Sequence, residues 1–272
     1  MPDINETECF SLDDISYTNE RDYYKSGIKV CQDEGLQFSV GFDVEVTSDI
    51  PIQAGCSSSS SIMVGWIHFL SQMADKPINW QPDKIAELAY KAEVLEFGEP
   101  GGMMDQYSTA MGGLIYLESE PDIFIRSLNS ELGSFVLGDS CEPKDTMRIL
   151  QQCRNTRLNI MHKLKHQHQE FSIYSCEIDL DLSCLNPEEK KIFSGTIRNR
   201  DLLKQGMYEL EKDEPNHEVL GQLFTEHHAV LRDVLNISTA KIESMLNAAL
   251  KAGAHGGKIN GAGGGGCMFA YA

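Results

Sequence analysis

The sequence is poor in positive charge for its length of 272 residues. It has 23 lysines and arginines against 41 aspartates and glutamates, which gives a net charge of −18. We expect no nucleic acid and no membrane surface among its main partners, because both carry negative charge. The charge does not exclude a phosphate ligand, since backbone N–H groups or a metal ion can make a local positive site within an acidic protein.

Long apolar runs and paired cysteine motifs are also missing. The longest apolar stretch, Ile62 to Leu70, is too short to span a bilayer, and the first residues are polar and acidic, unlike a signal peptide. The eight cysteines are scattered and form no Cys-x-x-Cys motif, which favours reduced thiols over a zinc or disulfide scaffold. We therefore expect a cytoplasmic protein, and the sequence does not indicate its oligomeric state.

The hydrophobic patterning predicts an α+β protein of two domains, residues 1–125 and 126–272. Residues 36–47 alternate between apolar and polar side chains, which predicts a strand. A second strand is expected at 114–117, and a third after the glycines near the C-terminus. Helices are predicted at 21–34, from within the serine run near 57–61, and at 82–97, 103–111, 145–169, 187–204, 217–231 and 238–252.

A serine-rich turn follows the predicted strand and leads directly into an apolar helix. Its residues are Gly55, Cys56, Ser57, Ser58, Ser59, Ser60 and Ser61; we call them the serine loop. The N-terminus of a helix attracts phosphate through its unpaired N–H groups and its partial positive charge. The alternative is a serine that only caps the helix, but five consecutive serines are more than capping requires. No Gly-Lys-Ser/Thr follows, so the turn is not a Walker A motif.

Two carboxylates and a second glycine-rich turn are the other candidates. Glu93 and Asp105 flank a Pro-Gly-Gly break, and one could hold Mg²⁺ while the other accepts a hydroxyl proton. On spacing alone, Glu93 could equally face water and Asp105 could cap a helix. The run 261–266 suits a close backbone approach to a ligand, or a flexible turn before an edge strand. His162, His166 and His168 are predicted to lie on a solvated helix face, and His227 and His228 to serve packing.

These motifs, in this order, resemble those of the GHMP kinase superfamily and, within it, the galactokinase family. Segment 51–61 is similar to the family's phosphate loop, Pro-x-Gly-Ala-Gly-Leu-Ser-Ser-Ser-Ala-Ser. Ala92-Glu93, followed by Gly-Met-Met-Asp-Gln at 102–106, resembles its Ala-Glu and Gly-Ile-Met-Asp-Gln pair. Segment 258–267 resembles its C-terminal glycine motif, and 226–233 its Ser-His-x-x-Leu-Arg helix.

The resemblance implies a two-domain GHMP-kinase-like fold with the active site between the domains, and an ATP- and Mg²⁺-dependent kinase acting on the anomeric hydroxyl of a sugar. The serine loop and Gly263, Gly264 and Gly265 would contact the ATP phosphates. Ser59 and Glu93 would hold Mg²⁺, and Asp105 would be the catalytic base. These roles agree with the demands of phosphoryl transfer, which are positioning and charge neutralisation.

Several family features are absent. Nothing in residues 1–20 resembles the family's first motif, which supplies sugar contacts, and the chain stops within the last strand; we therefore expect a chain clipped at both ends. Gln53 and Cys56 stand where the family has glycine and leucine. Two alternatives stay open: a non-catalytic or truncated protein that binds ATP and sugar, and a kinase for another small molecule such as a different sugar, a uronic acid or a sugar phosphate.

Overall fold

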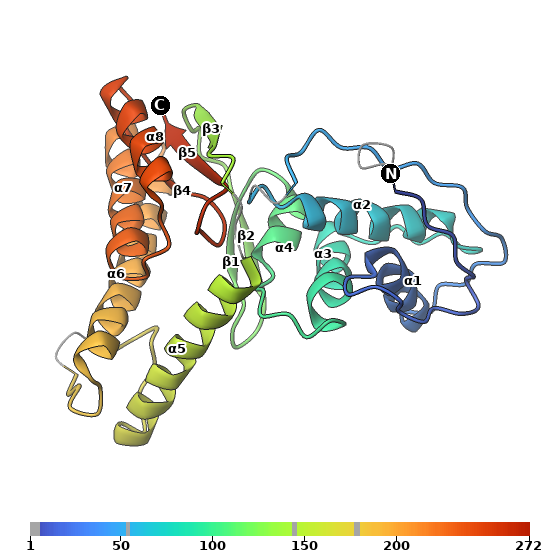
Figure 1. Ribbon diagram of the computed structural model, residues 1–272, viewed down its shortest axis with the longest axis horizontal. Coiled ribbons are helices and arrows are strands. Elements are labelled where there is room, and N and C mark those ends of the chain that lie inside the picture. Colours follow the sequence, from blue (N-terminus) through green and yellow to red (C-terminus); the bar gives the residue numbers. More distant parts are fainter. Residues whose placement is uncertain (1–5, 53–54, 143–145, 177–179) are drawn as a thin grey trace. The chain divides into compact units, whose positions relative to one another are not determined.

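The computed structural model describes residues 6–52, 55–142, 146–176 and 180–272, and the chain forms two compact units (Figure 1). Unit 1 is Met1–Ile52 with Cys56–Leu128, and unit 2 is Gln53–Gly55 with Asn129–Ala272. Both contain helices and antiparallel strands, so the predicted α+β class is confirmed. In the described part of the chain, no helix is both long and apolar enough to cross a membrane.

Unit 1 is mainly helical, and its helices begin and end close to the predicted positions. They are α1 (Tyr23–Asp33), α2 (Ser58–Met73), α3 (Pro82–Tyr90), the π-helix η2 (Lys91–Leu95) and α4 (Met104–Met111). The apolar stripes of α1, α2 and α3 form one core, in which Met63, Ile67, Leu70 and Leu88 are fully buried. Pro82 begins α3 because the first helical position needs no N–H donor.

The strand predicted at 36–47 is wrong: these residues form no β-ladder with any described segment. Phe42 packs instead on the helical core through ring contacts with Trp66 and Phe69, while Val40 and Val44 are 64% and 43% exposed. Asp75 holds the segment by accepting hydrogen bonds from the N–H and hydroxyl of Ser39. The alternating pattern is present, but a strand also requires a neighbour for its backbone groups.

A hairpin completes unit 1. Strand β1 (Leu114–Glu118) confirms the predicted strand and pairs in antiparallel register with β2 (Phe124–Leu128), which the sequence did not reveal. The register places Leu114 opposite Leu128, and the ladder keeps β2 in unit 1.

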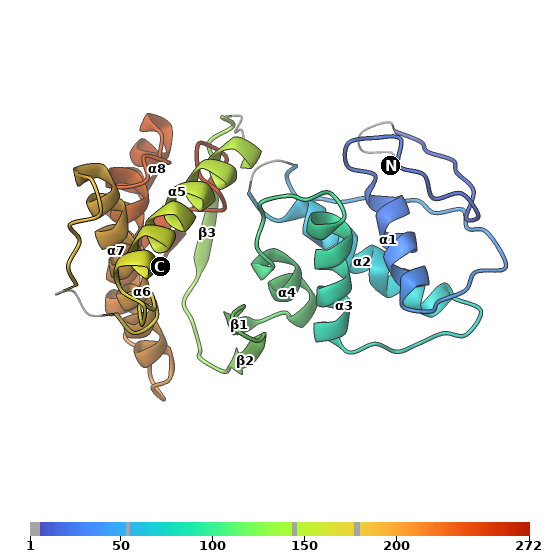
Figure 2. The same cartoon turned by 90° about the horizontal axis from the view of Figure 1, so that it is seen from below.

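Unit 2 combines long helices with a three-stranded antiparallel sheet (Figures 1 and 2). Its helices are α5 (Thr146–Gln167), α6 (Pro187–Leu210), α7 (His217–Asp233) and α8 (Ala240–Lys251), all at predicted positions. The sheet order is β3 (Phe135–Asp139), β5 (Cys267–Tyr271), β4 (Gly256–Ile259), so β4 is an edge strand. Asn186 caps α6 in a capping box with Glu189, and the hydroxyl of Thr239 caps α8.

Helix α7 packs against β4 with backbone almost touching backbone. A Cβ atom built on Gly256 would lie 1.7 Å from the carbonyl oxygen of Gly221, and one built on Gly221 would lie 2.3 Å from the carbonyl carbon of His255. Neither position has room for a side chain. The two glycines therefore set the separation of this helix from this strand.

Candidate active site

The serine loop turns sharply before α2. Gly55 has a φ of +85°, and Ser57 has a φ of +54°, in the left-handed region. A left-handed serine is uncommon and costs on the order of 1 kcal/mol. The turn brings the chain abruptly into α2 at Ser58, so the serines occupy the helix N-terminus, as predicted. Gln53 lies outside the described residues.

Capping does not explain the serines. Ser57 is the N-cap residue, yet its side chain makes no capping hydrogen bond. The first backbone bond of the helix runs from the N–H of Ser61 to the carbonyl of Ser57, at 2.9 Å. The N–H groups of Ser58, Ser59 and Ser60 precede that bond and have no partner within the helix. They are directed out of the helix N-terminus, where an anion is favoured.

Glu93 and Ser60 are joined by a residue that the sequence analysis did not single out. Gln106 on α4 donates its side-chain N–H groups to a carboxylate oxygen of Glu93 at 2.6 Å and to the hydroxyl of Ser60 at 3.2 Å. All three side chains are buried, with Glu93 only 6% exposed. Glu93 lies on the π-helix η2, a type of irregularity common at functional sites. The amide oxygen of Gln106 is buried and has no hydrogen-bond partner in the described chain.

Asp105 lies beside Gln106 in the first turn of α4 but is exposed. Successive helical residues are about 100° apart, so Asp105 faces solvent while Gln106 faces the interior. Among the described residues, its carboxylate has no hydrogen-bond or ion-pair partner. The structure thus connects Glu93 to Ser60 through Gln106, and it shows no direct contact of Ser59 or Asp105 with Glu93.

The glycine loop (residues 260–266) is held by a few backbone hydrogen bonds. Gly264 donates its N–H to the carbonyl of Ile237 at 2.6 Å, and Gly266 donates to the carbonyl of Glu142 at 3.1 Å. Gly263, Gly264 and Gly265 all have positive φ angles, which favours glycine at each position. Within the described chain, the N–H groups of Gly263 and Gly265 have no protein acceptor, whereas that of Gly264 is occupied.

Asn260, the first residue of the glycine loop, contacts Gly55, the residue of the serine loop that belongs to unit 2. Its side-chain amide donates to the carbonyl of Gly55 at 2.9 Å. The two residues are 205 positions apart in the sequence. No spacing rule could have paired them.

Lys258, near the start of the glycine loop, and His227 on α7 both have pKa values lowered by burial. The Lys258 ammonium lies 5.4 Å from the centre of the Phe269 ring, and burial lowers the pKa of Lys258 to about 8. Burial, followed by the charges of Lys258 and Arg157, lowers the pKa of His227 to about 4. His227 is therefore neutral near pH 7.

His162 and His166 lie on α5, and His168 follows its last residue. His162 and His166 are exposed, and the ring of His168 contacts the carbonyl of Asp181 at 2.8 Å. The described residues contain no group of three or more His, Cys, Asp or Glu side chains that could hold a metal ion. The motifs that concentrate unpaired donors are the serine loop and the glycine loop.

Two models of one protein family match the chain. The model of the GHMP kinases N terminal domain matches residues 22–113, and that of the GHMP kinases C terminal domain matches residues 206–272. Together they cover more than half of the chain, in the expected order. The chain belongs to the GHMP kinases. It is therefore a small-molecule kinase by family.

Curated relatives of this GHMP kinase include galactokinases and mevalonate kinases. A galactokinase of Pyrococcus furiosus is 29% identical over 98% of this chain and 74% of its own length. A mevalonate kinase of Thermococcus gammatolerans is also 29% identical, over 98% of this chain and 72% of its own length. Because the galactokinase and the mevalonate kinase have the same sequence identity to this chain, the identity does not indicate which substrate it uses.

Solved structures support the fold. The galactokinase of Lactococcus lactis complexed with galactose matches with a TM-score of 0.80 and 20% identity, over 96% of this chain and 70% of that chain. A mevalonate kinase of L. major matches with a TM-score of 0.55 and 21% identity, over 79% of this chain and 56% of that chain. At these identities the likeness concerns the fold alone.

Proposed function

We propose that this GHMP kinase transfers the γ-phosphate of ATP to the anomeric hydroxyl of a sugar. The observation that carries the proposal is the N-terminus of α2, where three successive serine N–H groups have no helical partner. Kinases of this family use ATP as phosphate donor, and an ATP phosphate tail fits such a set of donors. We also propose Gly263 and Gly265 as phosphate-binding residues, because their N–H groups have no protein acceptor in the described chain.

Residues near the serine loop fit the Mg²⁺ ion that accompanies ATP. Mg²⁺ prefers oxygen ligands, and Ser59 and Glu93 supply a hydroxyl and a carboxylate. The fit is supported by the buried amide oxygen of Gln106, which has no partner in the described chain and would be a further oxygen donor for such an ion. We propose Ser59 and Glu93 as the residues that hold Mg²⁺, directly or through water. When bound, the ion neutralises part of the phosphate charge.

Asp105 is proposed as the catalytic base. Its carboxylate is exposed and has no protein partner in the described chain, so it is available to a substrate hydroxyl. The hydroxyl oxygen forms a bond to the γ-phosphorus while the bond from that phosphorus to the β–γ bridging oxygen breaks. The hydroxyl proton passes to Asp105, and ADP leaves. Positioning of the two reactants supplies most of the remaining acceleration.

The substrate is proposed to be a neutral sugar such as galactose. The net charge of −18 disfavours a polyanionic substrate, and the motif Gly-Met-Met-Asp-Gln at 102–106 is close to the galactokinase form. ATP-dependent product formation should be measured with galactose, other sugars, a uronic acid and mevalonate. Phosphorylation of mevalonate alone would refute the sugar assignment. ATP binding with no product from any substrate would favour the non-catalytic alternative.

A further inference from the structure

Strand β4 leads directly into the glycine loop, and its outer edge is closed by side chains of α7. The strand pairs with β5 along one edge only, so alternate N–H groups point away from the sheet. Two of these belong to Gly257 and Ile259. Gly257 donates to the hydroxyl of Thr225 at 3.3 Å, and Ile259 donates to Nδ1 of His228 at 3.2 Å. Helix α7 thus supplies the acceptors that a further strand would otherwise provide.

These contacts indicate which tautomer of His228 is present. Its Nδ1 faces an N–H donor and must therefore carry the lone pair, so the proton is on Nε2. Nε2 lies 2.7 Å from a carboxylate oxygen of Glu243 on α8. His228 is only 4% exposed. The imidazole donates to Glu243 and accepts from Ile259, and neither ring nitrogen is left free.

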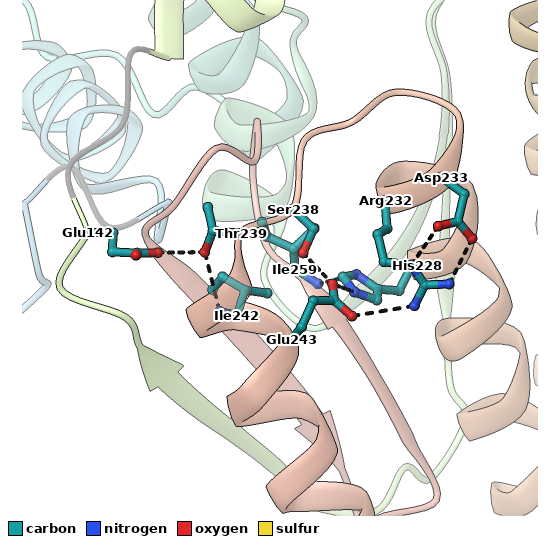
Figure 3. A network of polar contacts seen from close by, with 9 residues as sticks. All are labelled: Glu142, His228, Arg232, Asp233, Ser238, Thr239, Ile242, Glu243 and Ile259. Atoms are coloured by element: carbon teal, nitrogen blue, oxygen red, sulfur yellow. Dashed lines mark hydrogen bonds and ion pairs between the residues drawn. The ribbon is translucent and has the colours of Figure 1, made fainter.

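Glu243 is itself fixed in place, as Figure 3 shows. It accepts hydrogen bonds from the hydroxyl of Ser238 and from the guanidinium of Arg232, the latter at 3.4 Å. Burial opposes its charge, but the hydrogen bonds from Ser238 and His228 outweigh burial and lower the pKa of Glu243. The carboxylate is therefore ionised, which keeps the Nε2 proton of His228 directed toward it.

The segment 237–239, which contains Ser238, also holds the far end of the glycine loop. Thr239, next to Ser238, donates its hydroxyl to the carboxylate of Glu142 at 2.5 Å (Figure 3), and the Glu142 carbonyl accepts the N–H of Gly266. Ile237, on the other side of Ser238, accepts the N–H of Gly264. His228 thus holds the start of the loop through Ile259. Ile237 holds Gly264, and Glu142, which Thr239 contacts, holds Gly266.

We propose that His228, oriented by Glu243, is a positioning residue that fixes where the glycine loop leaves β4 and so aims the free N–H groups of Gly263 and Gly265. His228 touches no substrate in this role and acts only through the backbone of Ile259. The inference rests on the proposed function, in which those N–H groups bind phosphate.

Two amide substitutions separate the two ring contacts. In His228→Asn, the amide oxygen is as many bonds from Cα as Nδ1 and can accept from Ile259. In His228→Gln, the amide nitrogen is as many bonds from Cα as Nε2 and can donate to Glu243, but Ile259 loses its acceptor. His162→Gln, on the exposed face of α5, is the matched control. Glu243→Gln is a second test that leaves the imidazole in place.

Amide hydrogen exchange of residues 259–266, without nucleotide, is the direct measurement. We expect exchange about tenfold faster in His228→Gln than in the wild type, and close to wild type in His228→Asn. The KM for ATP should rise about tenfold in His228→Gln, with a smaller change in kcat and none in the sugar KM, because loop contacts to ATP act in ground and transition states alike. Glu243→Gln should fall between the wild type and His228→Gln.

Unchanged exchange in both His228→Gln and Glu243→Gln would overturn the inference, even if the wild type proved to be an active sugar kinase. Equal loosening in His228→Asn and His228→Gln would also overturn it, since the contact with Ile259 would not matter. If the wild type phosphorylated no substrate, the proposed function would fail, while the exchange experiment would still decide whether His228 orders the loop.

Discussion

The side-chain amide nitrogen of Gln106 lies 2.6 Å from a carboxylate oxygen of Glu93, and both side chains are buried. Glu93 is acceptor-only when ionised, so Gln106 must present its nitrogen and direct its own oxygen elsewhere. That orientation leaves the buried oxygen of Gln106 unpaired. A glutamine thus determines how the carboxylate proposed for Mg²⁺ is held.

Gln106→Leu should destabilise unit 1, because Glu93 and Ser60 would both lose a buried hydrogen-bond donor. We expect the free energy of unfolding to fall by about 2–3 kcal/mol, measured in urea. The Mg²⁺ concentration needed for half-maximal binding of MgATP should also rise, measured by calorimetry. Gln32→Leu, on the exposed side of α1, is the control and should change neither quantity. A stable Gln106→Leu variant with normal Mg²⁺ dependence would contradict the assignment.

Asp105→Asn should lower kcat by about 10²–10⁴-fold, the usual loss for removal of a general base. The Kd for ATP and the free energy of unfolding should stay near wild type, since the carboxylate is exposed and has no hydrogen-bond or ion-pair partner in the described chain. Single-turnover kinetics with ATP and galactose is the measurement. Asp122→Asn, also exposed, is the matched control. Full turnover by Asp105→Asn would exclude Asp105 as the base.

Ser59 and Ser60 are adjacent but should respond differently to loss of the hydroxyl. Ser60→Ala removes a buried partner of Gln106, so we expect about 1 kcal/mol of lost stability, and a double-mutant cycle with Gln106→Leu should show coupling. Ser59→Ala should leave stability within about 0.5 kcal/mol but weaken Mg²⁺-dependent ATP binding. If Ser59→Ala lowered stability and Ser60→Ala weakened Mg²⁺-dependent ATP binding, the assigned roles of the two serines would be wrong.

Lys258 predicts a dependence of stability on alkaline pH. Its pKa is about 8 in the folded protein, below the ordinary 10.5, so the unfolded chain binds this proton more tightly. Burying the charge therefore lowers stability below pH 8, and the penalty is relieved as pH rises from about 8 to about 10.5. Lys258→Met should raise the free energy of unfolding at pH 7 by about 1–3 kcal/mol, with the gain vanishing near pH 10.5.

Denaturant titrations at pH 7, 9 and 10.5 test this prediction. Lys251→Met, which removes an exposed lysine in the last turn of α8, should show no such gain at any pH. A gain for Lys258→Met that does not change with pH would mean that packing, and not the buried charge, is responsible.

Helices and the two loops could be predicted because their signals are local. The apolar stripe of α2, the proline at the start of α3 and the glycine breaks lie within a few residues of the elements they define. The segment 36–47 shows the limit of this approach, because its alternation cannot tell whether a neighbouring strand exists to pair with it. Strands β2 and β3 are five residues each and carry no clear alternation.

The contacts that organise the site are not local. Gln106 meets Ser60 across 46 residues, and Ile259 meets His228 across 31. The sequence predicted a helix at 217–231 and a packing role for His228. Nothing in the neighbouring sequence shows that its ring lies beside the unpaired edge of β4. The role of a residue that positions another can be recognised only when the structure shows which residue it contacts.

The close approach of Gly221 to Gly256 makes the position of His228 depend on two residues that have no room for a side chain. Seven residues of helix and three of strand both advance about 10 Å, so the helix that touches Gly256 at Gly221 meets Ile259 at His228. A single methyl group gained at either glycine would wedge α7 away from β4 and withdraw the imidazole from the strand. A screen for loss of the proposed kinase activity should therefore recover substitutions at both glycines.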